Sequence, residues 1–142
     1  MIRITSEPIH APSELRQFIR RAGEGAVASF IGTVRGEGGV ATLTLDHYAG
    51  FTEKQIAALV DRLIAEHGLA AAAVVHRYGA MKPGETILFA ATAASRRRAA
   101  LDALDSLVEQ LKTDAPFWKK ELRDGTEYWL EPPLAAATGS PA

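Results

Sequence analysis

The chain of 142 residues contains no cysteine. This absence excludes disulfide bonds, thiolate nucleophiles, and zinc or iron–sulfur sites held by cysteine. Histidine is scarce too, and the four that occur lack a metal-ligand spacing such as His-x-x-x-His: His10, His47, His67 and His76. We therefore expect neither a metal ion nor another cofactor.

A strong excess of one charge is also missing, because the formal net charge at pH 7 is −1. A general nucleic-acid-binding protein would carry a marked basic excess, so that class is disfavoured. No apolar run approaches the ~20 residues that span a bilayer, and the first residues lack the basic and then apolar layout of a signal peptide. With 47% hydrophobic and 23% charged residues, the composition is that of a soluble globular domain, expected in the cytoplasm.

Periodic apolar residues predict an alternation of strands and helices. Strands are expected at residues 2–9, 25–34, 40–48, 71–78, 86–93, 117–121 and 127–131. Helices are expected at residues 12–22, from a capping box of Thr52 with Gln55 to Gly68, and from a cap at Ser95 to about Lys112. The run 25–34 is mostly apolar and small, which indicates a buried strand.

Turn residues indicate how these elements connect. Asp124-Gly125 predicts a two-residue hairpin, and the turn at 82–85 lets strand 86–93 pair back on strand 71–78. The glycine cluster at 36–39 suits either a hairpin turn or a phosphate loop, and the lack of a phosphate-binding motif favours the hairpin. Strands joined largely by hairpins, with helices inserted between pairs, predict an α+β domain with a mostly antiparallel sheet. We expect one domain over residues 1–131 and a disordered tail over 132–142.

The segment 111–121 carries an unusual mixture of large rings and ammonium groups. Pro116 ends the preceding helix, and Phe117 and Trp118 separate Lys112 from Lys119 and Lys120. The rings can anchor a strand whose lysines reach water, or they can wall a pocket in which a lysine is partly desolvated. On a helical wheel, Lys112 falls at the edge of an apolar stripe made of Leu101, Leu104, Val108 and Leu111.

Three arginines begin the same helix, and Arg97 falls in line with its apolar stripe. Cations at a helix N-terminus are unfavourable, so Arg96 and Arg97 predict either a solvated basic turn or a site for an anion such as phosphate. Arg97 and Lys112 are fifteen positions apart, which is roughly 22 Å along a helix. One small ligand cannot contact both in one chain, so a shared site would require a homodimer.

Four stretches together resemble a known family: Thr33-Val34-Arg35, the run 43–54, the run 75–79 with Pro83-Gly84, and the run 111–121. They resemble the large, catalytic subunit of molybdopterin synthase, collinearly from about residue 2 to residue 131. The resemblance implies an α/β-hammerhead fold and a sulfurtransferase that converts cyclic pyranopterin monophosphate to molybdopterin. It implies a small ubiquitin-like subunit whose C-terminal Gly-Gly thiocarboxylate supplies the sulfur, which fits a chain without cysteine. It also implies a heterotetramer, with a central homodimer of large subunits.

The resemblance further implies roles for single residues. Lys112 and Lys119 match two essential lysines of the family, which could stabilise an oxyanion, move protons or transiently accept the acyl group. Arg35 matches a substrate-site arginine. The remaining substrate contacts implied are backbone groups of Thr33 and Val34, and the side chains of Lys120 and Glu121.

Arg97 matches the arginine of a substrate-binding His-Arg pair that acts across the dimer. Arg96 stands where the family has the histidine. Anion binding should survive this replacement, whereas a proton-transfer role of the histidine would not. An alternative function is therefore a non-catalytic anion-binding or protein-interaction domain of the same fold.

Overall fold

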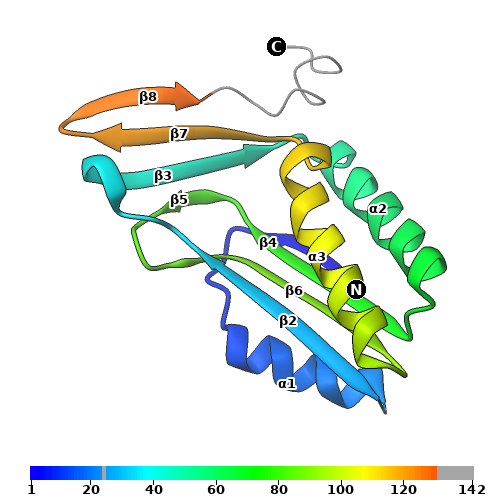
Figure 1. The fold of residues 1–142 in the computed structure, drawn as a ribbon. Coiled ribbons are helices and arrows are strands. Elements are labelled where there is room, and N and C mark those ends of the chain that lie inside the picture. Colours follow the sequence, from blue (N-terminus) through cyan, green and yellow to red (C-terminus); the bar gives the residue numbers. More distant parts are fainter. Residues whose placement is uncertain (24, 131–142) are drawn as a thin grey trace.

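Two four-stranded sheets form the frame of the computed structural model, which describes residues 1–23 and 25–130 (Figure 1). The first sheet has the order β1-β4-β6-β2, with strands Ile2–Thr5, Ala71–Arg77, Thr86–Ala94 and Ala26–Thr33. The second has the order β5-β3-β7-β8, with strands Gly79–Met81, Val40–His47, Phe117–Arg123 and Thr126–Leu130. Within this part of the chain only β1 and β4 pair in parallel. The predicted α+β class with mostly antiparallel pairing is confirmed.

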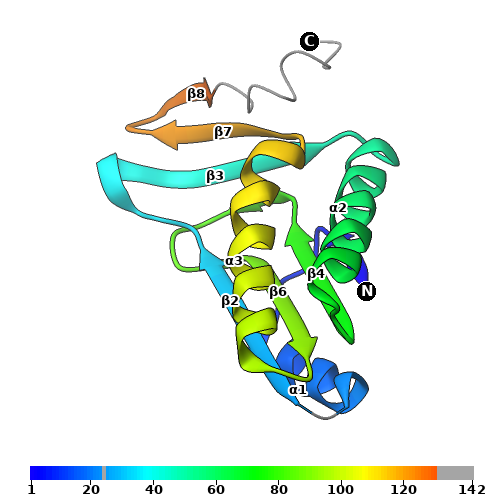
Figure 2. The ribbon, with the colours of Figure 1, turned by 45° about the vertical axis from the view of Figure 1, so that its right-hand side comes forward.

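Three helices cover the first sheet on both faces: α1 (Ala11–Ala22), α2 (Phe51–His67) and α3 (Arg97–Asp114). Figures 1 and 2 show α2 and α3 side by side on one face and α1 on the other. The alternation of β4 explains this arrangement, because Val74 points to the α2–α3 core while Val75 points to the α1 core around Phe18. Both faces of the central strands β4 and β6 are therefore buried.

The glycine cluster at 36–39 is not a hairpin turn, so that prediction was wrong. β2 pairs with β6 in the first sheet, and β3 pairs with β5 and β7 in the second. A short 3₁₀ helix, Glu37–Gly39, carries the chain between the sheets, with Gly38 and Gly39 at φ of 72° and 75°. Glycine-rich sequence indicates that the backbone turns, but it does not specify which strand follows as a neighbour.

The expected burial of the run 25–34 was also wrong for the single chain. β2 is an edge strand, and Val27, Phe30 and Ile31 are 37%, 37% and 46% exposed. An apolar strand pattern shows that a surface needs covering, but not that the same chain covers it.

The helix caps differ from the expected ones. α2 begins after Gly50, whose N–H donates to the Glu53 carboxylate at 3.4 Å, so Thr52 and Gln55 do not form the cap. α3 begins after Arg96 without a side-chain cap, so Ser95 is not its cap. Hydroxyl residues near a helix start compete for several partners, and spacing alone does not decide among them.

The other bounds follow the sequence closely. The first strand ends at Thr5 rather than at residue 9, and α3 ends at Asp114, two residues beyond Lys112. The β7–β8 hairpin is confirmed, with Asp124 and Gly125 at φ of 49° and 77°. The predicted tail at 132–142 and the end of the last strand at 131 lie outside the described residues. None of the described helices is long and apolar enough to cross a membrane.

Candidate functional site

A pocket of about 150 Å³ lies where the C-terminal end of α3 meets the start of β7. Its walls are mainly apolar side chains from β2, β3, β6, α3 and β7. Three side chains bring polar groups into this lining: His76 from β4, Lys112 from α3 and Lys119 from β7. The structure therefore brings the two lysines singled out by the sequence to one place.

The bend between α3 and β7 explains how the two lysines meet. Ala115 leaves the helical region with φ −94° and ψ 108°, as expected for a residue before proline, and β7 begins at Phe117. Successive side chains of a strand point to opposite faces, so Phe117 and Lys119 share one face while Trp118 lies on the other. Lys112 in the last turn of α3 and Lys119 thus line the pocket from two elements.

Thr52 fixes this bend from outside the segment. Its side chain is fully buried, and its hydroxyl donates to the carbonyl of Pro116 at 3.0 Å. The same oxygen accepts the N–H of Tyr48 at 3.1 Å. Thr52 therefore ties the start of α2 to the α3–β7 junction, a role that no local sequence pattern indicated.

The two pocket lysines differ from Lys120 in their partners. In the described part of the chain, neither Lys112 nor Lys119 forms an ion pair with an acidic side chain. Lys120 points towards β8, where it lies 3.4 Å from the Glu127 carboxylate and 5.2 Å from the centre of the Trp129 ring. Lys120 is therefore already paired, whereas the pocket lysines keep uncompensated charges.

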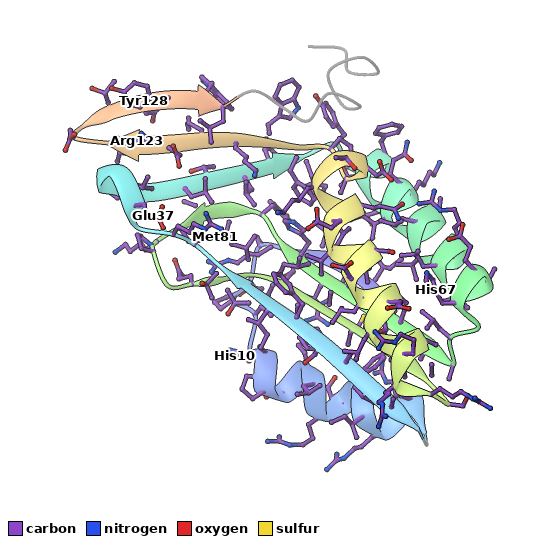
Figure 3. All side chains as sticks on the ribbon, viewed as in Figure 1. His10, Glu37, His67, Met81, Arg123 and Tyr128 are labelled. Atoms are coloured by element: carbon purple, nitrogen blue, oxygen red, sulfur yellow. The ribbon has the colours of Figure 1, made fainter. Side chains whose placement is uncertain are left out.

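Glu121 is also engaged, because it accepts a hydrogen bond from Arg123 Nε at 3.1 Å. Arg123 in turn lies over the Tyr128 ring, and Figure 3 shows both at the outer end of the β7–β8 hairpin. Neither Lys120 nor Glu121 belongs to the pocket lining. The structure thus separates them from the two pocket lysines.

His76 is a pocket residue that the sequence reasoning missed as a functional candidate. Its ring stacks on Phe117 with centroids 3.9 Å apart and 16° between the planes. Burial lowers the pKa of His76 to about 4; the nearby charges of Lys119 and His47 act in the same direction, and a hydrogen bond to the Arg77 carbonyl opposes them. The imidazole is therefore uncharged at neutral pH. The alternation of strand 71–78, which places His76 on the same face as Val74, was the signal that could have identified it.

Arg35 follows a firmly held strand end. Val34 is buried; its N–H donates to the Glu85 carbonyl at 2.9 Å, and its carbonyl accepts the Gly84 N–H at 2.9 Å. Arg35 then projects as an exposed side chain. The structure does not place Thr33 or Arg35 in the pocket lining, and the N–H of Val34 is already used.

Arg96 and Arg97 lie exposed at the opposite end of α3 from the pocket. Because one helix contains both Arg97 and Lys112, the spacing of roughly 22 Å applies within the chain. The structure does not bring these arginines to the pocket of their own chain.

The buried stripe of α3 is turned relative to the predicted one. The buried stripe consists of two alanines and two leucines: Ala100, Ala103, Leu107 and Leu111. Leu101, which the helical wheel placed in the stripe, is 51% exposed. The helical wheel favoured large apolar residues, whereas small alanine side chains let the helix lie close to the sheet. Of the predicted stripe, Leu111 is buried while Leu104 and Val108 are half-buried.

The chemistry of the pocket follows from these groups. Lys112 and Lys119 are both exposed, so their ammonium groups meet solvent beside a mainly apolar pocket, and within the described residues neither has an acidic partner. Two such cations at one place attract an anion. The described residues contain no cluster of three His, Asp or Glu side chains that could hold a metal ion. The site therefore suits the anionic end of a narrow molecule.

Comparisons with known proteins give this site a context. A family model described as "MoaE protein" matches residues 4–114. A Caulobacter vibrioides protein described as "Molybdopterin synthase catalytic subunit" is 40% identical over 134 residues, which are 93% of this chain and 89% of that protein.

Solved structures agree with that match. The MoaE protein of Burkholderia ambifaria superposes with a TM-score of 0.80 at 36% identity, covering 92% of this chain and 88% of that one. The molybdopterin synthase structure from Staphylococcus aureus contains a chain with a TM-score of 0.81 at 28% identity, covering 91% and 96%.

Proposed function

Since the chain belongs to the MoaE protein family, we propose that it is the catalytic subunit of a molybdopterin synthase that takes its sulfur from a protein thiocarboxylate. It is a sulfurtransferase of molybdenum cofactor biosynthesis. The sulfur donor is the C-terminal Gly-Gly thiocarboxylate of a small ubiquitin-like subunit, and the acceptor is cyclic pyranopterin monophosphate. Both partners are anions, which matches the pocket lysines Lys112 and Lys119, whose ammonium groups have no acidic partner among residues 1–23 and 25–130.

One observation carries this proposal: Lys112 and Lys119 line one small, mainly apolar pocket, and neither forms an ion pair with an acidic side chain of the described residues. A thiocarboxylate at the end of a Gly-Gly tail is both anionic and slender enough to enter such a pocket. When the thiocarboxylate reacts, charge develops on its oxygen, and a nearby ammonium group stabilises that charge. A lysine that loses its proton could also accept the acyl group transiently. Lys112 and Lys119 are the catalytic residues in this scheme.

The pterin phosphate binds to exposed guanidinium groups. Arg35 contributes from the end of β2, and Arg96 and Arg97 contribute from a second copy of the chain, since they lie roughly 22 Å from the lysines of their own. Replacement of the family histidine by Arg96 adds a cation, which strengthens phosphate attraction.

The neighbouring residues take lesser parts in substrate binding. Thr33 lies at the end of β2, and both backbone groups of Val34 are already used, the N–H by the Glu85 carbonyl and the carbonyl by the Gly84 N–H. Lys120 would have to leave Glu127 to contact substrate, and Glu121 would have to leave Arg123.

A homodimer is supported by the exposed apolar surface of β2. Val27, Phe30 and Ile31 form an apolar edge strand that a second chain can cover. Such an arrangement would bring the start of one α3 towards the pocket of the other chain. With a small subunit at each end, the assembly is a cytoplasmic heterotetramer.

The second candidate function is a non-catalytic anion-binding domain of the same fold. The specific observation favouring it is Arg96, which removes a histidine that could transfer protons. The two lysines that line one pocket favour the enzyme, because a domain that only binds anions on its surface has no need of a mainly apolar pocket.

The deciding experiment is sulfur transfer to cyclic pyranopterin monophosphate with a thiocarboxylated small subunit. Wild type should form molybdopterin, Lys119→Ala should lose most of the activity, and Lys54→Ala on the exposed side of α2 should retain it. If wild type bound the small subunit but formed no product, the enzymatic function would be lost and the anion-binding alternative would replace it.

A further inference from the structure

Of the three polar side chains that line the pocket, His76 is the one that is uncharged at neutral pH. It lines the same cavity as Lys112 and Lys119, and it reaches that cavity from β4, a strand of the other sheet from that of Lys119. The proposed function assigns work to the two ammonium groups but none to this imidazole.

Two contacts determine how the imidazole is presented. Nδ1 lies 3.0 Å from the carbonyl oxygen of Arg77. A carbonyl can only accept, so Nδ1 carries the proton and donates, which leaves Nε2 with the lone pair in the neutral ring. The stack on Phe117 holds the ring plane in place. Within the described chain, Nε2 has no hydrogen-bond partner of its own.

The pocket thus offers donors and one acceptor. The ammonium groups of Lys112 and Lys119 can donate but never accept, and the neutral Nε2 can accept but not donate. An N–H group that enters an apolar pocket without finding an acceptor is destabilised by roughly 1–3 kcal/mol. A simple anion would use the two lysines and leave Nε2 unused. A chain end that carries both an anion and a nearby N–H group would use all three.

Resting on the proposed function, we propose that His76 is a specificity-determining residue that recognises the peptide backbone of the inserted tail. Its Nε2 accepts a hydrogen bond from a backbone N–H of the C-terminal Gly-Gly, while Lys112 and Lys119 bind the terminal carboxylate or thiocarboxylate. The imidazole thereby distinguishes a peptide tail from a free anion of similar charge.

The chain offers a graded set of substitutions at this position. His76→Gln carries an amide oxygen to about the place of Nε2 and keeps an acceptor. His76→Asn reaches only as far as Nδ1, so it keeps a donor for the Arg77 carbonyl and loses the acceptor. His76→Phe keeps a ring to stack on Phe117 and loses both polar atoms. A role limited to supporting Phe117 predicts that Phe is the best replacement; a recognition role predicts that Gln is.

The experiment pairs these variants with a matched change in the partner. The small subunit is prepared with a normal Gly-Gly carboxylate end, and again with N-methylglycine in place of each glycine in turn, which removes one N–H. We expect one methylated form to bind wild type about 3- to 10-fold more weakly, as the loss of one hydrogen bond implies. That difference should shrink towards onefold in His76→Asn and His76→Phe and persist in His76→Gln. An equal loss in wild type and in all three variants would assign the effect to the bulk of the methyl group and overturn the proposal.

Kinetics separate this inference from the proposed function. With the thiocarboxylated small subunit, His76→Asn should raise KM for that subunit about 3- to 10-fold while changing kcat little, and Gln should restore KM. Thermal unfolding confirms that each variant is folded. If wild type formed product but the coupling with N-methylation were absent, the role of His76 would fail while the function stood. If the coupling were present but wild type formed no product, the role of His76 in binding the tail would stand while the proposed function failed.

Discussion

The hydroxyl of Thr52 donates to the carbonyl of Pro116 at 3.0 Å, so the start of α2 holds the bend that separates the two pocket lysines. Thr52 and Pro116 are 64 positions apart in the sequence. The contact connects a buried hydrogen bond with the geometry of the site.

Replacing Thr52 by valine should therefore destabilise the fold and reduce activity. Valine has nearly the same shape but lacks the hydroxyl that donates to the Pro116 carbonyl and accepts the Tyr48 N–H, and the loss of these hydrogen bonds costs roughly 1–3 kcal/mol. Denaturant unfolding measures the loss. Serine keeps the hydroxyl, so Thr52→Ser should recover most of the stability; a valine variant as stable as wild type would contradict this account.

Replacing either pocket lysine should reduce activity without reducing stability. Lys112 and Lys119 make no ion pair in the described chain, so their removal should change the free energy of unfolding by no more than about 0.5 kcal/mol. Activity should fall by about 10²-fold or more if each stabilises developing charge. The two measurements are denaturant unfolding and initial rates, and a variant that lost stability and activity together would indicate a structural lysine instead.

Mixing two inactive chains should restore activity. Arg97→Ala and Lys119→Ala affect opposite ends of α3, and a site shared between chains contains one intact copy of both residues in a mixed dimer. Because roughly 22 Å separates the two ends of α3, each site takes its arginine from one chain and its lysine from the other. A mixed dimer therefore has one site with both residues intact and one with both replaced, so about half of the sites are intact. Co-expression with two different tags isolates the mixed dimer for rate measurements. No recovery in isolated mixed dimers would rule out sharing.

The exposed side of β2 should control the oligomeric state. Ile31→Glu places a charge on the apolar edge strand and should yield a monomer in analytical ultracentrifugation. Phe51, 49% exposed at the start of α2, provides the control. Because α2 packs mainly against α3, β1 and β4, Phe51→Glu should leave the dimer intact. If the Ile31→Glu protein remained a dimer, the dimer interface would not be formed by β2.

The pKa of His76 predicts how stability depends on pH. Burial holds this pKa near 4 in the folded protein, below the ordinary value of 6.5, so between these values the unfolded chain binds the extra proton. Stability should fall as the pH drops through this window, by up to about 3 kcal/mol. Thermal unfolding at pH 7 and pH 4.5 should show a smaller difference for His76→Phe than for wild type. Equal differences would indicate that His76 does not contribute.

The sequence predicted local structure well where residues carry a direct backbone constraint. Pro116 ended α3, and Asp124-Gly125 formed the hairpin. The resemblance to the molybdopterin synthase family and the α+β class were confirmed as well.

Long-range partners were the part that could not be predicted. The 36–39 turn was expected to form a hairpin because turn residues specify a change of direction and not a pairing. Thr52 was expected to cap a helix because its spacing from Gln55 is that of a capping box. Its actual partner, Pro116, is 64 positions away, and no local pattern reveals such a contact. His76 was overlooked because its pocket forms only when β4, α3 and β7 meet.

The alternation of β7 has a consequence for how this protein can change over time. Lys119 and Lys120 are chemically identical neighbours, and only the two-residue period of the strand sends one to the pocket and the other to Glu127. Deleting a single residue between Pro116 and Lys119 would move Lys120 into the position of Lys119, so the pocket would still receive a lysine from β7. Inserting a residue there would move Lys120 to the position of Glu121, outside the pocket lining. The paired lysines therefore protect this side of the site against the loss of one residue and not against the gain of one.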